Sequence, residues 1–169
     1  MEALEAIFSR RSIRKYKPDA VADATLQLVL KSAMVAPSAF DERPWHFVVI
    51  QEQSALCAIA DKIDHCEMLR EAAAGILVCG DKRLERVPGF WEQDCSACSQ
   101  NILLAAHALG LGAVWLAVYP LADRIESLRA MLGIPEEVTP FALISLGYPN
   151  EELGPEERYD SARIHYNNW

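Results

Sequence analysis

The sequence predicts an α/β fold of three layers, in which helices cover both faces of a central sheet. Three observations lead to this prediction. A chain of 169 residues is long enough to bury a core of its own. Segments with helical and strand-like apolar patterns alternate along it. The strand-like segments are short and almost continuously apolar, which is typical of strands that are covered on both faces. We therefore expect one domain over residues 1–169.

The first two helices are expected near the N-terminus. Residues 3–9 have the apolar spacing of a short helix. Asp23 is a suitable N-cap for a longer helix over residues 24–35, because a short side-chain acceptor can bind the free N–H groups of a first turn. Pro37 should end that helix, since the residue before a proline disfavours helical geometry.

Two strands and a helix follow. Residues 45–50 form an apolar run with β-branched side chains, which predicts a strand. Ser54 can cap a helix over residues 55–63. Residues 75–79 predict a second buried strand.

The second half of the chain repeats this alternation. The longest expected helix covers residues 91–109, and Gly110 follows it as the left-handed residue that commonly ends a helix. Residues 113–118 predict a strand, residues 122–132 a helix, and residues 141–146 the last strand.

The composition limits the kinds of partner. The net charge is −8, which argues against nucleic acid and against an anionic membrane surface. No apolar run approaches the roughly 20 residues that span a bilayer. The acidic N-terminus does not resemble a signal peptide, and five cysteines without the spacing of a secreted scaffold favour the cytoplasm. Cys95 and Cys98 lie one turn apart inside an expected helix, so we expect them to be structural, and we expect no metal site.

The most informative segment is basic. Five of the 16 Lys and Arg residues fall within residues 10–17, around Ser12. Like charges at this density repel one another, and a compact anion among them would relieve the repulsion. The segment therefore points to a phosphorylated small ligand. A solvated run of charge near a terminus is the alternative.

Four segments together resemble the FMN-dependent nitroreductase family. They are Arg-Arg-Ser-x-Arg at residues 10–14, Pro-Ser-Ala followed by Pro-Trp-x-Phe-Val-Val at residues 37–49, the run over residues 100–112, and residues 145–165. They occur in the expected order and cover essentially the whole chain.

The resemblance implies an α/β (α+β) fold with a central mixed sheet, built as a homodimer that binds FMN at the subunit interface. The tail, residues 148–169, would wrap the partner subunit, and its aromatic residues agree with this, because a disordered tail is usually poor in aromatic residues.

The resemblance also implies where FMN would lie. The cofactor-binding residues would be Arg10, Arg11, Ser12, Arg14 and Arg158 at the phosphate and ribityl chain, Pro37, Ser38 and Ala39 of the other subunit beside the isoalloxazine ring, and Trp115, Leu116 and Ala117 beside the ring through their backbone. Two positions depart from the family pattern. Asp41 stands where Asn is frequent and Arg43 where Gln is frequent, and we expect these changes to affect substrate preference.

The implied activity is a ping-pong oxidoreduction. NAD(P)H would pass a hydride to flavin N5, and a nitroaromatic, quinone or similar acceptor would then collect the electrons. We assign no catalytic side chain, because the chemistry lies on the flavin. No Gly-x-Gly-x-x-Gly opens a helix after a strand, so no separate dinucleotide-binding domain is expected. The alternative is a non-catalytic FMN carrier or redox-reporting protein.

Overall fold

The computed structural model describes residues 1–154 and 156–169. The elements follow the expected order, and each expected helix and strand is present. They are α1 (Ala3–Ser9), α2 (Asp23–Met34), β1 (Trp45–Ile50), α3 (Gln53–Lys62), β2 (Ala74–Asp81), α4 (Trp91–Ala108), β3 (Gly112–Ala117), α5 (Ala122–Leu132) and β4 (Val138–Gly147).

The starts of α2 and α3 differ from the prediction. Asp23 is the first residue of α2 and not its N-cap, and its carboxylate accepts a hydrogen bond from the Gln51 side chain at 3.1 Å. Ser54 lies inside α3, which begins one residue earlier. Both predictions were wrong because a cap residue marks a helix start only to within one or two positions, and a competing tertiary contact can recruit its side chain.

The strands form one sheet in the order β1-β2-β4-β3. All three pairings are antiparallel, so the expectation of a mixed sheet was wrong, although the α+β class is confirmed. Among the described residues, the one parallel bridge outside the named strands joins Ser12 to Ala113. An apolar run shows that a strand is covered on both faces, and it carries no information about strand direction.

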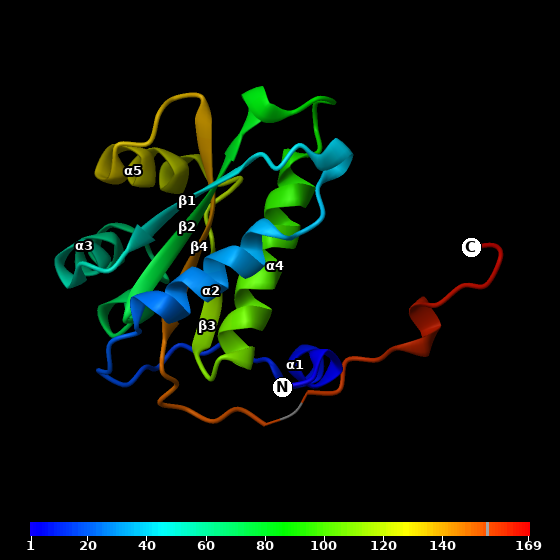
Figure 1. The fold of residues 1–169 in the computed structure, drawn as a ribbon, viewed down its shortest axis with the longest axis horizontal. Coiled ribbons are helices and arrows are strands. Elements are labelled where there is room, and N and C mark those ends of the chain that lie inside the picture. The colour runs from blue at the N-terminus through cyan, green and yellow to red at the C-terminus, as the bar shows by residue number, and fades with distance from the viewer. Residues whose placement is uncertain (155) are drawn as a thin grey trace.

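Helices cover both faces of the sheet. Figure 1 shows α2 and α4 on one side and α3 and α5 on the other. The side chains between the sheet and each helix pair form a separate apolar core. One core contains Val29, Ile76, Ile102 and Ile144, and the other contains Leu56, Leu77, Leu128 and Leu143, all of them almost fully buried. The three layers that the apolar strands predicted are therefore present.

The basic segment is fixed to the sheet by its backbone. The Ile13 N–H donates to the Ala113 carbonyl at 3.1 Å, and the Lys17 N–H donates to the Tyr148 carbonyl at 2.9 Å. The hydroxyl of Tyr16, which is buried, lies 2.7 Å from Ser145 Oγ and donates to the Ile13 carbonyl at 2.7 Å. Charged residues 10–17 consequently run along an ordered backbone beside β3.

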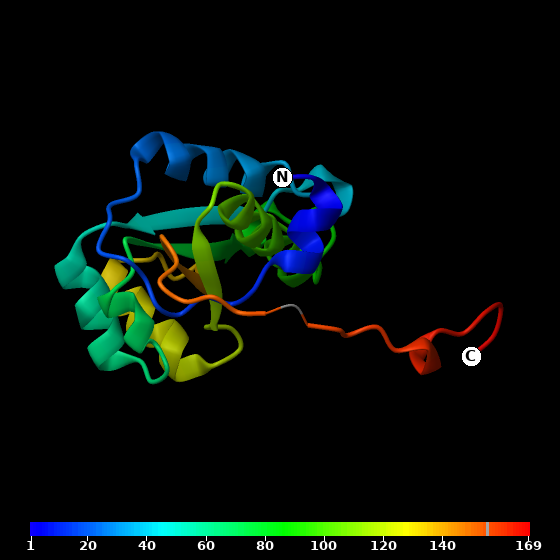
Figure 2. The same cartoon turned by 90° about the horizontal axis from the view of Figure 1, so that it is seen from below.

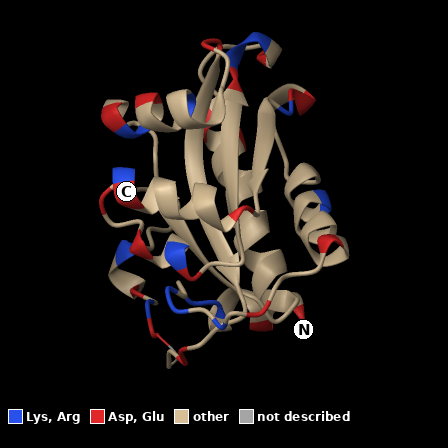
Figure 3. Cartoon of the chain, turned by 90° about the vertical axis from the view of Figure 1, so that its left-hand side faces the viewer, with Lys and Arg blue, Asp and Glu red and all other residues tan. Residues whose placement is uncertain are grey.

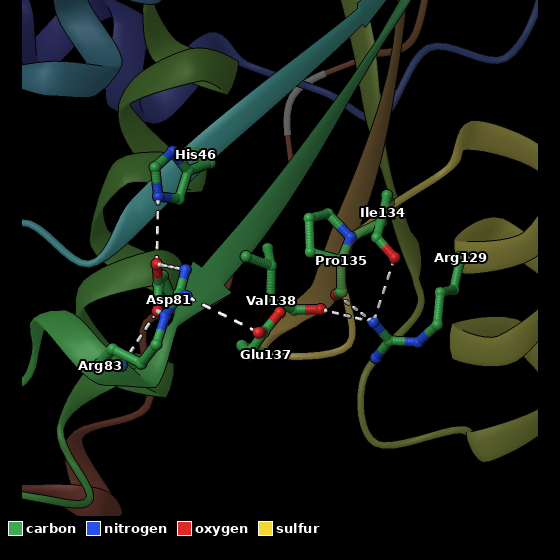
Figure 4. Close-up of polar contacts among 8 residues, drawn as sticks. All are labelled: His46, Asp81, Arg83, Arg129, Ile134, Pro135, Glu137 and Val138. Carbon is green, nitrogen blue, oxygen red and sulfur yellow. Dashed lines mark hydrogen bonds and ion pairs between the residues drawn. The ribbon is translucent and has the colours of Figure 1, made fainter.

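Polar contacts tie the far ends of β2 and β4 to the neighbouring loops (Figure 4). The buried carboxylate of Asp81 accepts two hydrogen bonds from the Arg83 side chain, at 2.9 and 2.8 Å, and His46 Nε2 lies 3.6 Å away. The Arg83 guanidinium lowers the pKa of Asp81 to about 2. Arg129 donates to backbone carbonyls around the start of β4, including that of Val138 at 3.0 Å.

The tail leaves the body of the molecule. Figure 2 shows the last residues extending away from the sheet and helices, and every residue from 156 to 169 is exposed. None of the described helices is both long and apolar enough to span a membrane.

Candidate functional site

The basic segment and the tail enclose one cavity. Its volume is about 260 Å³, and Figure 3 shows Lys and Arg gathered along the lower edge of the molecule, where the N-terminal segment runs. All five residues that were expected at a phosphate lie in its lining: Arg10, Arg11, Ser12, Arg14 and Arg158, together with Leu153 and Glu156. Residues separated by more than 140 positions in the sequence thus meet around one concave basic surface.

Arg11 is positioned by carbonyl groups. Its Nε donates to the Gly154 carbonyl at 2.9 Å, and its Nη1 donates to the carbonyls of Phe8 and Arg10 at 3.1 and 2.8 Å. Its remaining nitrogen, Nη2, is buried and has no hydrogen-bond partner among the described residues. A buried guanidinium donor without an acceptor is unfavourable, so Arg11 keeps an uncompensated charge beside the cavity that it helps to line.

Charge repulsion acts on Arg10. Partial burial and the positive charges of Arg158 and Arg11 lower the pKa of its guanidinium. The side chain forms no hydrogen bond or ion pair among the described residues. Arg158 itself pairs with Glu156 on the exposed tail. The cavity therefore carries an excess of positive charge that its own carboxylate only partly offsets.

A second cavity shares one lining residue with the first. Its volume is about 530 Å³, and Arg14 lines both. Trp115, Leu116 and Ala117 at the end of β3 lie in its wall, as expected for the residues beside a flavin ring. The first cavity is lined mainly by charged residues, and the second has a partly apolar lining, with Arg14 in the wall of each.

Besides Val114 of β3, sequence reasoning missed four residues of this second cavity that lie outside that strand. They are His65, Glu67, Met68 and Arg124. Arg124 on α5 donates to the Ala117 carbonyl at 2.7 Å and to the Asp64 carbonyl at 2.9 Å, so it fixes the end of β3 to the loop after α3. No pattern in the sequence marks these positions, because only the packing of α3 and α5 on one sheet face brings them to β3.

The loop over residues 37–43 lies elsewhere. Its Ala39 N–H donates to the Asp94 carboxylate in the first turn of α4 at 2.9 Å. The basic segment instead adjoins the last turn of α4, where the Ser9 hydroxyl lies 2.7 Å from His107 Nε2. A helix of 18 residues is about 27 Å long. Within one chain, Pro37, Ser38 and Ala39 are therefore far from the basic cavity, whereas the end of β3 lies nearer the first turn of α4, where the Tyr119 hydroxyl donates to Glu92 at 2.8 Å.

Asp41 and Arg43 pair with each other on this loop. Arg43 Nε and Nη2 donate to the two oxygens of Asp41 at 2.6 and 2.5 Å, and both side chains are exposed. Phe40, Asp41 and Arg43 all have positive φ, at 50°, 58° and 49°. This backbone region is unfavourable for residues with a Cβ atom. Three such residues within four positions indicate that surrounding contacts hold the loop in a strained conformation.

A third cavity, of about 440 Å³, holds none of the expected site residues. The chain over residues 16–20 covers it, and Arg70 and Glu71 line it with opposite charges. Cys95 and Cys98 are buried in α4, and burial raises the pKa of both thiols. No group of metal-ligating side chains occurs within residues 1–154 and 156–169.

Comparisons with known proteins agree on one family. A model described as the nitroreductase family matches residues 7–77 and 64–148. The chain is 52% identical, over its whole length and 88% of the relative's, to a Methanothermobacter thermautotrophicus protein provisionally named an NADH dehydrogenase/NAD(P)H nitroreductase.

Solved structures agree with this assignment. A Parabacteroides distasonis protein with the same provisional name has a TM-score of 0.94 and 42% identity, covering 99% of this chain and 98% of that one. A Desulfovibrio desulfuricans protein, provisionally named a nitroreductase and solved in complex with FMN, has a TM-score of 0.85 and 30% identity, covering 100% and 98%.

Proposed function

Because the chain belongs to the nitroreductase family, we propose that it is an FMN-dependent oxidoreductase that transfers electrons from NAD(P)H to a nitroaromatic, quinone or similar acceptor. Its close relatives are named NAD(P)H nitroreductases or NADH dehydrogenases, and a structural neighbour was solved with FMN. We extend this family assignment to a cofactor, to the site that binds it and to the order in which the two substrates react.

The observation that carries the proposal is the crowding of cations around the basic cavity, where Arg10 has no side-chain partner among the described residues and lies near the charges of Arg158 and Arg11. A phosphate monoester in the cavity could accept from Arg10 and from the Ser12 hydroxyl together. Arg158 could exchange its tail carboxylate, Glu156, for the same phosphate. The donor set thus fits the phosphate end of FMN.

The second cavity fits the other end of the cofactor. FMN, when bound, supplies hydride acceptance at N5 from NAD(P)H and reduction of a second substrate in a ping-pong order. Arg14 lies between the two ends. The backbone of Trp115, Leu116 and Ala117 would flank the ring, and Arg124 would keep that strand end in place. No side chain is assigned as an acid or base.

A homodimer would complete the site. Residues 37–43 lie at the opposite end of α4 from the basic cavity, and in the arrangement that the family resemblance implies they would reach the FMN ring from a second chain. The surface of one chain agrees with such a partner, because large apolar side chains are exposed on α1, on the loop and on the tail. They include Leu4, Phe8, Phe40, Tyr166 and Trp169. We propose that the tail, residues 148–169, packs on the partner subunit and buries part of this surface.

An absorbance spectrum of the purified protein tests the proposal, followed by addition of NADH or NADPH under nitrogen. We expect flavin bands that bleach promptly and return when a quinone or nitroaromatic compound is added. Bleaching by one nucleotide and not by the other would identify the donor.

Two other results would contradict the proposal. A colourless protein that takes up no added FMN would remove the cofactor assignment. Bound FMN that neither nucleotide reduces would favour the alternative of a non-catalytic flavin carrier.

A further inference from the structure

Two buried carboxyl groups lie at the loop over residues 37–43, one on the loop and one on α4, and the charge of Glu42 acts on Asp94. Glu42 on the loop is 8% exposed, and Asp94 in the first turn of α4 is 4% exposed. Each has one oxygen with a backbone partner. Glu42 Oε1 accepts from the Val87 N–H at 3.2 Å, and Asp94 Oδ1 accepts from the Ala39 N–H at 2.9 Å. The second oxygen of each, Glu42 Oε2 and Asp94 Oδ2, is buried without a hydrogen-bond partner among the described residues.

No cation compensates this pair. Neither carboxyl forms an ion pair with any Lys, Arg or His within the described part of the chain, in contrast to buried Asp81, which Arg83 holds with two hydrogen bonds (Figure 4). Two buried carboxylates without a counter-ion are strongly unfavourable, and the usual outcome is that one of them keeps its proton.

The surroundings favour a proton on Asp94. Burial and the negative charges of Glu42 and Glu85 raise its pKa, and only the hydrogen bond from the Ala39 N–H opposes this. Glu85 itself accepts from the N–H groups of Gly89, Phe90 and Trp91 through Oε1, at 2.8 to 3.1 Å, and these three hydrogen bonds fix the position of its carboxyl group.

Other titratable or charged groups lie near the pair without contacting it. The thiols of Cys95 and Cys98 are neutral because burial raises their pKa. Lys82 lies over the Trp91 ring at 4.9 Å, and the charge of Arg86 acts on Asp41. A partner subunit could not reach the unpartnered oxygens either, since one chain alone already encloses them.

We infer that Asp94 holds a proton beside Glu42 and that this neutral carboxyl is a positioning residue, which keeps the strained loop over residues 37–43 in place against α4. Few other contacts hold the loop: the Ser38 hydroxyl accepts from the Arg43 N–H at 3.1 Å, and Phe40 packs edge-on against Phe90. Ionisation of Asp94 would place two anions under the loop and loosen it. The consequence for flavin rests on the proposed function, whereas the buried proton does not.

The test compares the wild type with Asp94→Asn, Glu42→Gln and the control Asp81→Asn between pH 5 and 9. A carboxyl whose pKa is raised by folding stabilises the fold fully at low pH, and this contribution is lost as the pH rises through the folded-state pKa. We expect the melting temperature of the flavin-free wild type to fall over that range relative to that of Asp94→Asn, whose amide cannot ionise.

The two other variants test whether Asp94 is the group that titrates. Glu42→Gln removes the neighbouring anion and so lowers the folded-state pKa of Asp94, so the fall in melting temperature should be smaller and should end at lower pH. Asp81→Asn should keep the wild-type pH dependence, because Arg83 keeps the Asp81 carboxylate ionised throughout this range. Infrared spectra should show the carbonyl band of a protonated carboxylic acid in the wild type and lack it in Asp94→Asn. Identical pH curves for the wild type and Asp94→Asn would overturn the inference, as would a pH dependence that only Glu42→Gln abolishes.

FMN titration of the same proteins tests the positioning role. The dissociation constant of the wild type should rise about fivefold or more across the transition, relative to that of Asp94→Asn, which is the lower end of typical coupling between sites. A proton on Asp94 without any change in FMN affinity would overturn the positioning role. Absence of FMN binding at every pH would instead contradict the proposed function, and the melting curves would still decide where the proton lies.

Discussion

Arg10 shows how one side chain can oppose folding stability while serving the proposed site. It is half-buried, lies near Arg11 and Arg158, and has no partner among the described residues. Arg11 differs, because it also joins the basic segment to the tail through the Gly154 carbonyl. Replacing Arg11 would therefore mix effects on structure and on binding, whereas replacing Arg10 separates them.

We predict that Arg10→Met raises the melting temperature of the flavin-free protein and weakens FMN binding. The repulsion disappears in the free protein, and a charge-assisted hydrogen bond to phosphate disappears in the complex. The dissociation constant should rise roughly tenfold to hundredfold, since a hydrogen bond to a charged group contributes about 1.5–3 kcal/mol. Thermal melts and fluorescence titration measure the two effects.

Lys15→Met is the matched control for this prediction. Lys15 is an exposed cation in the same segment and does not line the basic cavity, so the change in net charge is equal. We expect little change in the melting temperature or in the dissociation constant for FMN. A similar loss of FMN affinity in both variants would mean that overall charge, and not a contact at Arg10, controls binding.

At the scale of elements, the contact between the basic segment and β3 positions the site. The Ile13 side chain packs directly on the backbone of Gly112, where a Cβ atom would lie 2.6 Å from Ile13 Cγ2. Gly112 is thus required because the Ile13 side chain packs so close to its backbone, and not because its φ angle is unusual. The same approach sets the distance between the phosphate donors on residues 10–14 and the strand expected beside the ring.

We predict that Gly112→Ala destabilises the protein by about 1–3 kcal/mol, the usual effect of overpacking, and weakens FMN binding. The added methyl group must push residues 12–14 away from β3. Denaturant unfolding and FMN titration measure these effects. Gly154→Ala is the control, because no atom lies within 4 Å of the position its Cβ would take. An unchanged affinity in Gly112→Ala would show that this spacing does not control the site.

At the scale of the whole molecule, one chain contains two separated halves of the proposed site. The basic cavity lies at one end of α4 and the loop over residues 37–43 lies at the other. The tail extends away from the molecule (Figure 2), and its aromatic side chains are exposed. A second copy of the chain would explain both features, because it could bring its loop to the cavities and receive the tail.

We predict that removing residues 161–169, which leaves Arg158 in place, weakens the dimer without unfolding the chain. Every deleted residue is exposed in a single chain, so only contacts between subunits should be lost. Aromatic residues at an interface can contribute about 2 kcal/mol or more each, so the dimer dissociation constant should rise at least about hundredfold. Sedimentation measurements on both proteins over a range of concentrations test this, and an unchanged association would remove the tail from the interface.

Local sequence patterns were sufficient to predict the α-helices, the strands and the charged half of the proposed site. Apolar periodicity located the α-helices and strands of the described residues, although not the short 3-10 helices, because burial acts on each segment separately. The crowding of five cations in residues 10–17 is visible without a fold. Strand direction, the contribution of Arg124 and the placing of Glu42 beneath the loop with Asp94 depend on how distant segments pack. Those features arise from contacts between residues far apart in the chain, which a local pattern does not encode, and only the tertiary structure decides them.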